Sequence, residues 1–394
     1  MTATTEREVT VAPTGSPAER FTSFDPDAFP APRSRDEEWR FAPFTRLRPL
    51  FEAGATGGHL GWDSHLPEGV TYSEVGVDDP RVAGAPAPPD RLGALAHAHV
   101  EAAAVITVAP NATPGEAVRL TLSGDDAATQ VWGRVVVDVG HHAEVTVVVD
   151  HRGKATYVAE TSILVGEGAK VTYVQVDDWD AGSVHAEHVG TRVGRDASFR
   201  HIGVTLGGDV VRVVPTVEFA GPGAHAELLG VGFAGDDEHF ETRLFVDHNV
   251  DRCTSDVLYK NALLGQTART VWVGDVRIRP AAIGTRTFEL NRNLLLSDGA
   301  RADSVPNLEI ETGEIEGAGH ASATGRFDDL QLFYLQSRGI PEKEARFLVV
   351  RGFFADVIRR IGLPDLEDRL MRSIDERLTE NMDTSLTDLI VSND

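Results

Sequence analysis

Cysteine is nearly absent from this sequence, which has a single one, Cys253, among 394 residues. One thiol excludes an internal disulfide framework, and it excludes any zinc or cluster site built from four cysteines of the same chain. The first residues, MTATTEREVT, lack a basic segment followed by an apolar run, so we expect no secretory signal. No stretch approaches the length of uninterrupted apolar sequence that a membrane-spanning helix needs. We therefore expect a cytoplasmic protein.

Positive charge is also scarce, with 37 Lys and Arg against 61 Asp and Glu and a net charge of −24. Such a surface repels nucleic acid and anionic lipid, so we expect neither as a partner. The GxxxxGK[ST] loop of P-loop ATPases is missing as well. The nearest stretch, GEGAKVT at 166–172, has the wrong spacing.

Short valine-rich strands separated by turn residues fill the middle of the sequence, and they repeat. Glycines mark the repeat at gaps of 26, 28, 27, 27, 26 and 25 residues, with His248 in one vacant slot: Gly140, Gly166, Gly194, Gly221, His248, Gly274 and Gly299. An even period built from strands is typical of a solenoid, in which each turn stacks on the one before. We predict a mainly β fold, a right-handed parallel β-helix over residues 105–325. A β-sandwich of many short strands is the alternative, although sandwiches rarely keep so even a period.

The flanking regions differ from this central part. Residues 1–35 are rich in Thr, Pro, Ala and charge without periodicity, and we expect them to be disordered. Residues 36–104 are predicted to form a short helical and irregular region that ends in a helix over 90–104. From Asp328 the apolar period changes from 2 to 3.6, which predicts a C-terminal helical domain over 326–394.

The most specific signal lies in residues 291–340. It contains Asn-x-Asn-Leu-Leu-Leu-Ser at 291–297, Pro-x-Leu-Glu-Ile at 306–310 and Leu-Phe-Tyr-Leu-Gln-x-Arg-Gly-Ile at 332–340. In this order and spacing, these motifs resemble the C-terminal signature of the SufB/SufD family of iron–sulfur cluster assembly scaffolds. The resemblance is close over residues 291–340 and extends loosely over 90–380.

One element of the family signature is altered here. The family's Cys-x-His-x-Ala falls on Ala318-Gly319-His320-Ala321-Ser322, so the thiol is missing and the histidine remains. This departure makes the chain most like the SufD branch. The resemblance implies that His320 is a candidate iron ligand at a nascent-cluster site shared with a SufB-like subunit, and neutral imidazole is a competent iron ligand. A hydrogen-bonded structural histidine is the alternative.

The resemblance also implies partners. It predicts a non-catalytic scaffold subunit, not an enzyme, that works with a SufB-like subunit and the SufC ATPase to build and transfer nascent clusters. SufC is expected to bind the C-terminal helical domain through Phe333, Tyr334, Gln336, Arg338 and Gly339. We expect no cofactor to be bound stably by this chain alone; iron or a cluster would sit transiently at the subunit interface, and the complex could hold a flavin.

Two other functions remain open at this point. The first is a homodimeric structural protein of the same family. The second is a carbohydrate-active enzyme, since parallel β-helices commonly process polysaccharides. Such enzymes are usually secreted, so the expected absence of a signal argues against the second.

Five other residues have side chains that could take part in chemistry. The stretch HAEH at 185–188 places two histidines three residues apart. We interpret it as part of a loop, and metal binding by the two histidines is the less favoured alternative. Cys253 is expected to be a small buried hydrophobic residue, with a redox role as the alternative. Asn291 and Asn293 alternate along one strand, and we expect them to hydrogen-bond between turns of the β-helix.

Overall fold

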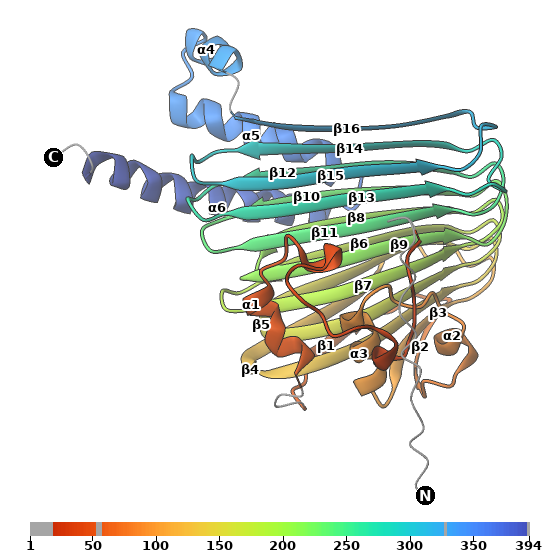
Figure 1. Cartoon of the computed structure of the whole chain (residues 1–394). Coiled ribbons are helices and arrows are strands. Elements are labelled where there is room, and N and C mark those ends of the chain that lie inside the picture. Colours follow the sequence, from red (N-terminus) through yellow and green to blue (C-terminus); the bar gives the residue numbers. More distant parts are fainter. Residues whose placement is uncertain (1–18, 53–56, 327–328, 392–394) are drawn as a thin grey trace, which may run out of the picture.

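The structure is a computed structural model that describes residues 19–52, 57–326 and 329–391 (Figure 1). Within these residues one 16-stranded sheet winds into a β-solenoid of about 8 turns, flanked by helices near both ends of the chain. The predicted fold class, mainly β with an N-terminal helical and irregular region and a C-terminal helical region, is confirmed. The strands are β1 (Gly61–His65), β2 (Val70–Val75), β3 (Ala103–Val108), β4 (Val118–Val139), β5 (Glu144–Val165), β6 (Lys170–Trp179), β7 (Val184–Val193), β8 (Ser198–Gly207), β9 (Val210–Phe219), β10 (His225–Ala234), β11 (His239–His248), β12 (Thr254–Leu263), β13 (Arg269–Ile278), β14 (Arg286–Leu295), β15 (Arg301–Ile310) and β16 (Gly317–Arg326).

The strands form two walls around a central lumen. The odd strands stack as β5-β7-β9-β11-β13-β15, and the even strands stack as β5-β6-β8-β10-β12-β14-β16, with every pair parallel. The long strand β5 belongs to both walls. At the beginning of the solenoid, β1 pairs antiparallel with β4 and β2 pairs antiparallel with β3. These two strands lie in a region for which we predicted only helices and irregular structure.

The repeat length changes along the solenoid, which corrects part of the sequence prediction. Glu144 pairs with Lys170, 26 residues later, but Thr254 pairs with Arg286, 32 residues later. The predicted corner positions are therefore right through Gly221, and His248 is the last residue of β11. Gly274 lies inside β13, so the prediction is wrong there, whereas Gly299 again lies in a turn, between β14 and β15. The physical reason is that later corner loops are longer, so a constant spacing no longer lands on every one of them.

Glycine is required at the early corners because successive turns touch there. A Cβ added to Gly166 would lie 2.7 Å from the carbonyl carbon of Gly140, and one added to Gly194 would lie 2.8 Å from the carbonyl oxygen of Val165. Real Cβ atoms do not approach backbone so closely. The alanines that follow these glycines, such as Ala169, point inward and are completely buried.

Helical segments cover the outer faces of both walls. The N-terminal part comprises η1 (Pro26–Ala28), η2 (Glu37–Trp39), α1 (Phe44–Leu47), η3 (Arg48–Phe51), α2 (Pro80–Ala83) and α3 (Arg91–His99). Its apolar side chains pack on the odd wall, with Trp39 and Leu92 against Val158 and Ala186. The C-terminal part comprises α4 (Asp329–Ser337), α5 (Glu342–Ile358) and α6 (Pro364–Val391), and α5 and α6 pack on the even wall (Figure 1).

The segment expected to be disordered, residues 1–35, has two parts. Residues 1–18 lie outside the described residues. Residues 19–35 follow the surface of the solenoid, where Arg20 forms an ion pair with Asp275 of β13. The ring of Phe24 packs on His97 of α3, with centroids 4.3 Å apart.

Candidate functional site at the open end of the solenoid

The last turn of the solenoid leaves two strand edges open among the described residues. β15 pairs with β13 alone, and β16 pairs with β14 alone. The side chains of Ser304 and Ser322 link the two strands through a 2.7 Å hydrogen bond. Pro306 lies in β15 without a backbone N–H, as expected for an edge strand. Open parallel edges present unpaired backbone groups to which another chain can add a strand.

His320 lies on β16 at this open end, and it is exposed. Side chains on a strand alternate between its two sides. Ala318, two residues earlier, packs against the apolar core of the lumen, so His320 lies on the lumen-facing side. Its neighbours on the strand are small, with Gly319 before it and Ala321 after it. Nothing bulky on β16 itself separates the ring from an approaching partner.

The position below His320 in the stack is Glu289 of β14. Glu289 is 1% exposed, and neither carboxylate oxygen has a hydrogen-bond partner among the described residues. Burial, reinforced by the charge of Asp275, raises the pKa of Glu289 to about 8. Space for this carboxyl exists because residue 274 is glycine. A Cβ atom added to Gly274 would lie only 2.8 Å from Glu289 Oε2. An unpartnered buried carboxyl beside an exposed imidazole can accept a proton or bind a cation.

The asparagines next to Glu289 form a hydrogen-bonded ladder between turns. The side-chain amide of Asn261 donates to Asn293 Oδ1 at 3.0 Å, and the amide of Asn293 donates to Asn291 Oδ1 at 2.7 Å. The amide of Asn293 also donates to Thr324 Oγ1 of β16 at 3.1 Å. The predicted structural role of Asn291 and Asn293 is confirmed, and the ladder anchors β16 beside His320.

Cys253 is not part of this site. Its side chain is fully buried at a corner of the solenoid, with Sγ 3.5 Å from the carbonyl oxygens of Gly221 and Asp251. Burial raises the pKa of the thiol. The residue is therefore the small buried group that we expected, and its thiol is poorly suited to act as a nucleophile.

The residues predicted to bind the ATPase lie on α4 or directly after it. Phe333 is 69% exposed and Tyr334 is 56% exposed, whereas Leu332 is buried. Arg338 donates to the Tyr334 hydroxyl at 2.9 Å and its guanidinium lies 5.1 Å from the ring centroid, which holds Tyr334 in place.

The remaining members of this set, Gln336 and Gly339, are exposed too. Leu330 lies one turn before Phe333 and is 77% exposed, so α4 presents a continuous apolar face. α4 lies beyond the end of β16 (Figure 1), so this face and His320 occupy different parts of the molecule.

The HAEH stretch lies in a strand and not in a loop, which corrects the sequence interpretation. Residues 185–188 belong to β7, so His185 and Glu187 point into the lumen and His188 points outward. His188 binds Glu160 Oε2 at 2.6 Å and Thr216 Oγ1 at 2.8 Å. The turn residues that suggested a loop are confined to 180–183. The alternation of His185 and Glu187 was the signal for an inward-facing polar pair.

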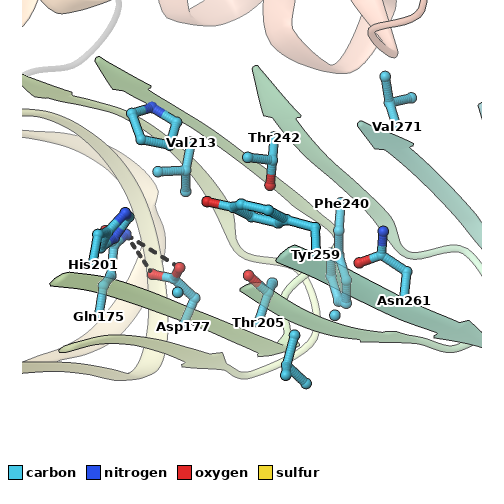
Figure 2. Close-up of a pocket in the computed structure, with 14 residues that line it drawn as sticks. Gln175, Asp177, His201, Thr205, Val213, Phe240, Thr242, Tyr259, Asn261 and Val271 are labelled. Carbon is cyan, nitrogen blue, oxygen red and sulfur yellow. Dashed lines mark hydrogen bonds between the residues drawn. The ribbon is translucent and has the colours of Figure 1, made fainter. Parts of the chain in front are cut away.

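The lumen is polar around His185 and Glu187, and no local sequence pattern indicated this. Figure 2 shows Gln175, Asp177 and His201 at one side of a small internal cavity, with Tyr259 and Asn261 at the other. These side chains come from β6, β8 and β12 of the even wall. In the part of the chain that the structure describes, no helix is long and apolar enough to cross a membrane.

Comparison with known proteins identifies the family of this chain. Residues 121–353 match the family model described as the SufBD core domain of SUF system FeS cluster assembly. An iron–sulfur cluster assembly SufBD family protein of Mycobacterium tuberculosis is 49% identical over 377 residues, which cover 94% of this chain and 95% of that protein. A protein of the same description from Mycobacterium leprae is 48% identical over 366 residues, or 91% and 93% of the two chains. The iron–sulfur cluster assembly protein SufD of Bacillus subtilis is 28% identical over 300 residues, or 73% and 67%.

Proposed function

Because the chain belongs to the SufBD family of the SUF system for iron–sulfur cluster assembly, we propose that it is a non-catalytic, SufD-like scaffold subunit of that machinery. It works in the cytoplasm with a SufB-like subunit and the SufC ATPase to build and transfer nascent clusters. The observation that supports this role best is the placement of His320 on an open edge strand, above the unpartnered carboxyl of Glu289.

The open end provides the docking surface for the SufB-like subunit. Strands of that subunit add to β15 and β16, which supplies backbone hydrogen bonds and covers the mouth of the lumen. The junction then contains His320 from this chain, and the thiolates come from the partner, since the one thiol here is buried. Iron and the growing cluster are the cargo of this site.

The apolar face of α4 is the docking surface for SufC. Force applied there reaches the solenoid through α5, because Lys260 of β12 binds Asp356 of α5 at 2.8 Å and the Phe353 carbonyl at 3.1 Å. Phe354 of α5 packs in the same interface against Phe233 of β10. ATP-driven movement of SufC is thereby transmitted to the even wall, whose last strand contains His320.

Coexpression with a SufB-like subunit and SufC tests the proposal. We expect one complex that contains all three proteins and that loads iron and sulfide during purification. The His320→Ala variant should assemble equally well and yield less cluster. A chain that stays alone would refute the partners, and an unchanged cluster yield would return His320 to a structural role.

The same open edges favour a second candidate. Two copies of this chain can pair through β15 and β16, which gives the homodimer of the alternative hypothesis. Light scattering of the isolated chain, and of a mixture with the SufB-like subunit, separates the two. A homodimer that persists in the mixture favours the alternative, and its replacement by a heterodimer favours the scaffold subunit.

A further inference from the structure

Two imidazoles and a carboxylate converge deep inside the lumen. His151 of β5, Asp177 of β6 and His185 of β7 are each at most 1% exposed. His151 Nδ1 lies 2.9 Å from Asp177 Oδ1, and His185 Nδ1 lies 3.1 Å from the same oxygen. One ligand atom of each residue lies within 4.8 Å of the others. The three side chains come from both walls of the solenoid, so the cluster spans the lumen.

The spacing matches that of ligands around a small metal ion. Nitrogen and oxygen ligands lie about 2.0–2.2 Å from zinc in tetrahedral sites, which places neighbouring ligand atoms roughly 3.3 Å apart. The two contacts to Asp177 Oδ1 are within a few tenths of an ångström of that separation. A bound ion would replace these two contacts and the hydrogen bond that the Trp179 indole N–H donates to His185 Nδ1 at 3.2 Å.

Charge in this part of the lumen also favours a cation. Asp177 and Glu187 are two buried carboxylates, 1% and 4% exposed. The described groups that bind them are the two imidazoles, the Gln175 amide and the Thr161 hydroxyl, with no lysine or arginine among them. Buried carboxylates are stabilised by a compensating positive charge, and among the described groups that bind these two only the imidazoles can carry one. A metal ion would supply that charge as well.

Several buried polar atoms around the cluster lack partners. Gln175 Oε1 makes no hydrogen bond, and both ring nitrogens of His201 are without one. His185 Nε2 has only the 3.4 Å contact with Glu187 Oε2. Asp177, Gln175 and His201 line the internal cavity of about 20 Å³ (Figure 2), which has room for one water molecule. Such atoms are uncommon in a folded interior unless a water or an ion satisfies them.

We propose that His151, Asp177 and His185 bind one divalent transition-metal ion of the zinc or ferrous class, with a water from the adjacent cavity as a further ligand. Two imidazoles and one carboxylate are a donor set that suits these ions. The bound ion ties the odd wall to the even wall across the lumen. This site is separate from the exposed His320, and it does not depend on the proposed role in cluster assembly.

Metal analysis of the isolated full-length chain tests this proposal. Protein expressed in medium supplemented with zinc or cobalt should purify with one ion per chain, and the cobalt form should show the visible absorption of a tetrahedral site. The double variant His151→Gln/His185→Gln and the single variant Asp177→Asn should each lose the ion. The matched control His141→Gln/His142→Gln removes two exposed histidines at a corner and should retain it, as should His320→Ala.

The outcomes are distinct. Wild-type protein without bound metal overturns the proposal, and so does an ion that remains in folded Asp177→Asn protein. If the lumen variants do not fold, X-ray absorption on the metal-loaded wild type decides, because the proposal requires two imidazole ligands. None of these results bears on partner binding, so failure here leaves the proposed function untouched.

Discussion

Glu289 and His320 occupy paired positions on neighbouring parallel strands, and they differ completely in environment. The carboxyl of Glu289 is buried without a hydrogen-bond partner among the described residues, whereas the imidazole of His320 is exposed at the mouth of the lumen. An acid and an imidazole stacked in this way can share a proton or a cation once a partner covers them.

We predict that Glu289→Gln lowers cluster formation in the complete complex. The amide keeps the shape of the side chain but cannot become the anion that would support a cation at His320. By analogy with residues that support metal ligands, the loss should be about tenfold or more. Iron and sulfide content of the purified complex measures it. The control Glu314→Gln alters an exposed carboxylate in the corner before β16 and should have no effect; equal losses in both variants would refute the role of Glu289.

The raised pKa of Glu289 predicts that stability falls as pH rises. In the unfolded chain this carboxyl ionises near its ordinary pKa of 4.5, whereas in the folded chain its pKa is about 8. Between these values the folded state holds a proton that the unfolded state has lost, so its contribution to stability decreases by up to about 1.4 kcal/mol per pH unit. Denaturant unfolding of wild type and Glu289→Gln between pH 5 and 8 should show a smaller decline for the variant. Parallel curves would contradict the assignment.

Bulky residues on the open edge should block association without unfolding the chain. Added side chains at Gly317 and Gly325 of β16 meet no atom within 4 Å, and neither glycine has a positive φ. We therefore expect Gly317→Arg/Gly325→Arg to fold normally and to lose pairing with the SufB-like subunit or with a second copy. Gly115→Arg is the matched control, because it is equally open but lies before β4 at the other end of the solenoid. Chromatographic coelution measures pairing, and coelution of both variants would exclude this edge as the interface.

The apolar face of α4 predicts a separate loss. Phe333→Ala/Tyr334→Ala should weaken SufC binding by about tenfold or more, since exposed aromatic side chains are frequent hot spots of interfaces. Folding should be unaffected, because both rings are mostly exposed. Trp62→Ala/Tyr72→Ala removes two partly exposed aromatic residues near the other end of the solenoid and serves as the control. Titration calorimetry with purified SufC gives the affinities; an equal effect of both pairs would mean that α4 is not the specific contact.

Sequence by itself determined the repetitive β architecture and the family signature. Corner glycines, valine-rich strands and the switch to a helical period are local patterns, and close stacking of turns makes glycine obligatory at Gly166 and Gly194. The motif at 332–340 also indicates the family from sequence alone. A general burial rule, however, would have placed Phe333 and Tyr334 in a core, and only the packing of α4 exposes them.

Tertiary structure alone decided which side chains meet. Glu289 lies beneath His320 because the last turn is 31 residues long, a length outside the period read from the sequence. His151, Asp177 and His185 converge because strands from two walls face one lumen. Corner length sets the register of each turn, and register sets which side chains stack. Long-range pairing therefore determines both candidate sites, while short-range pattern determines only the scaffold that holds them.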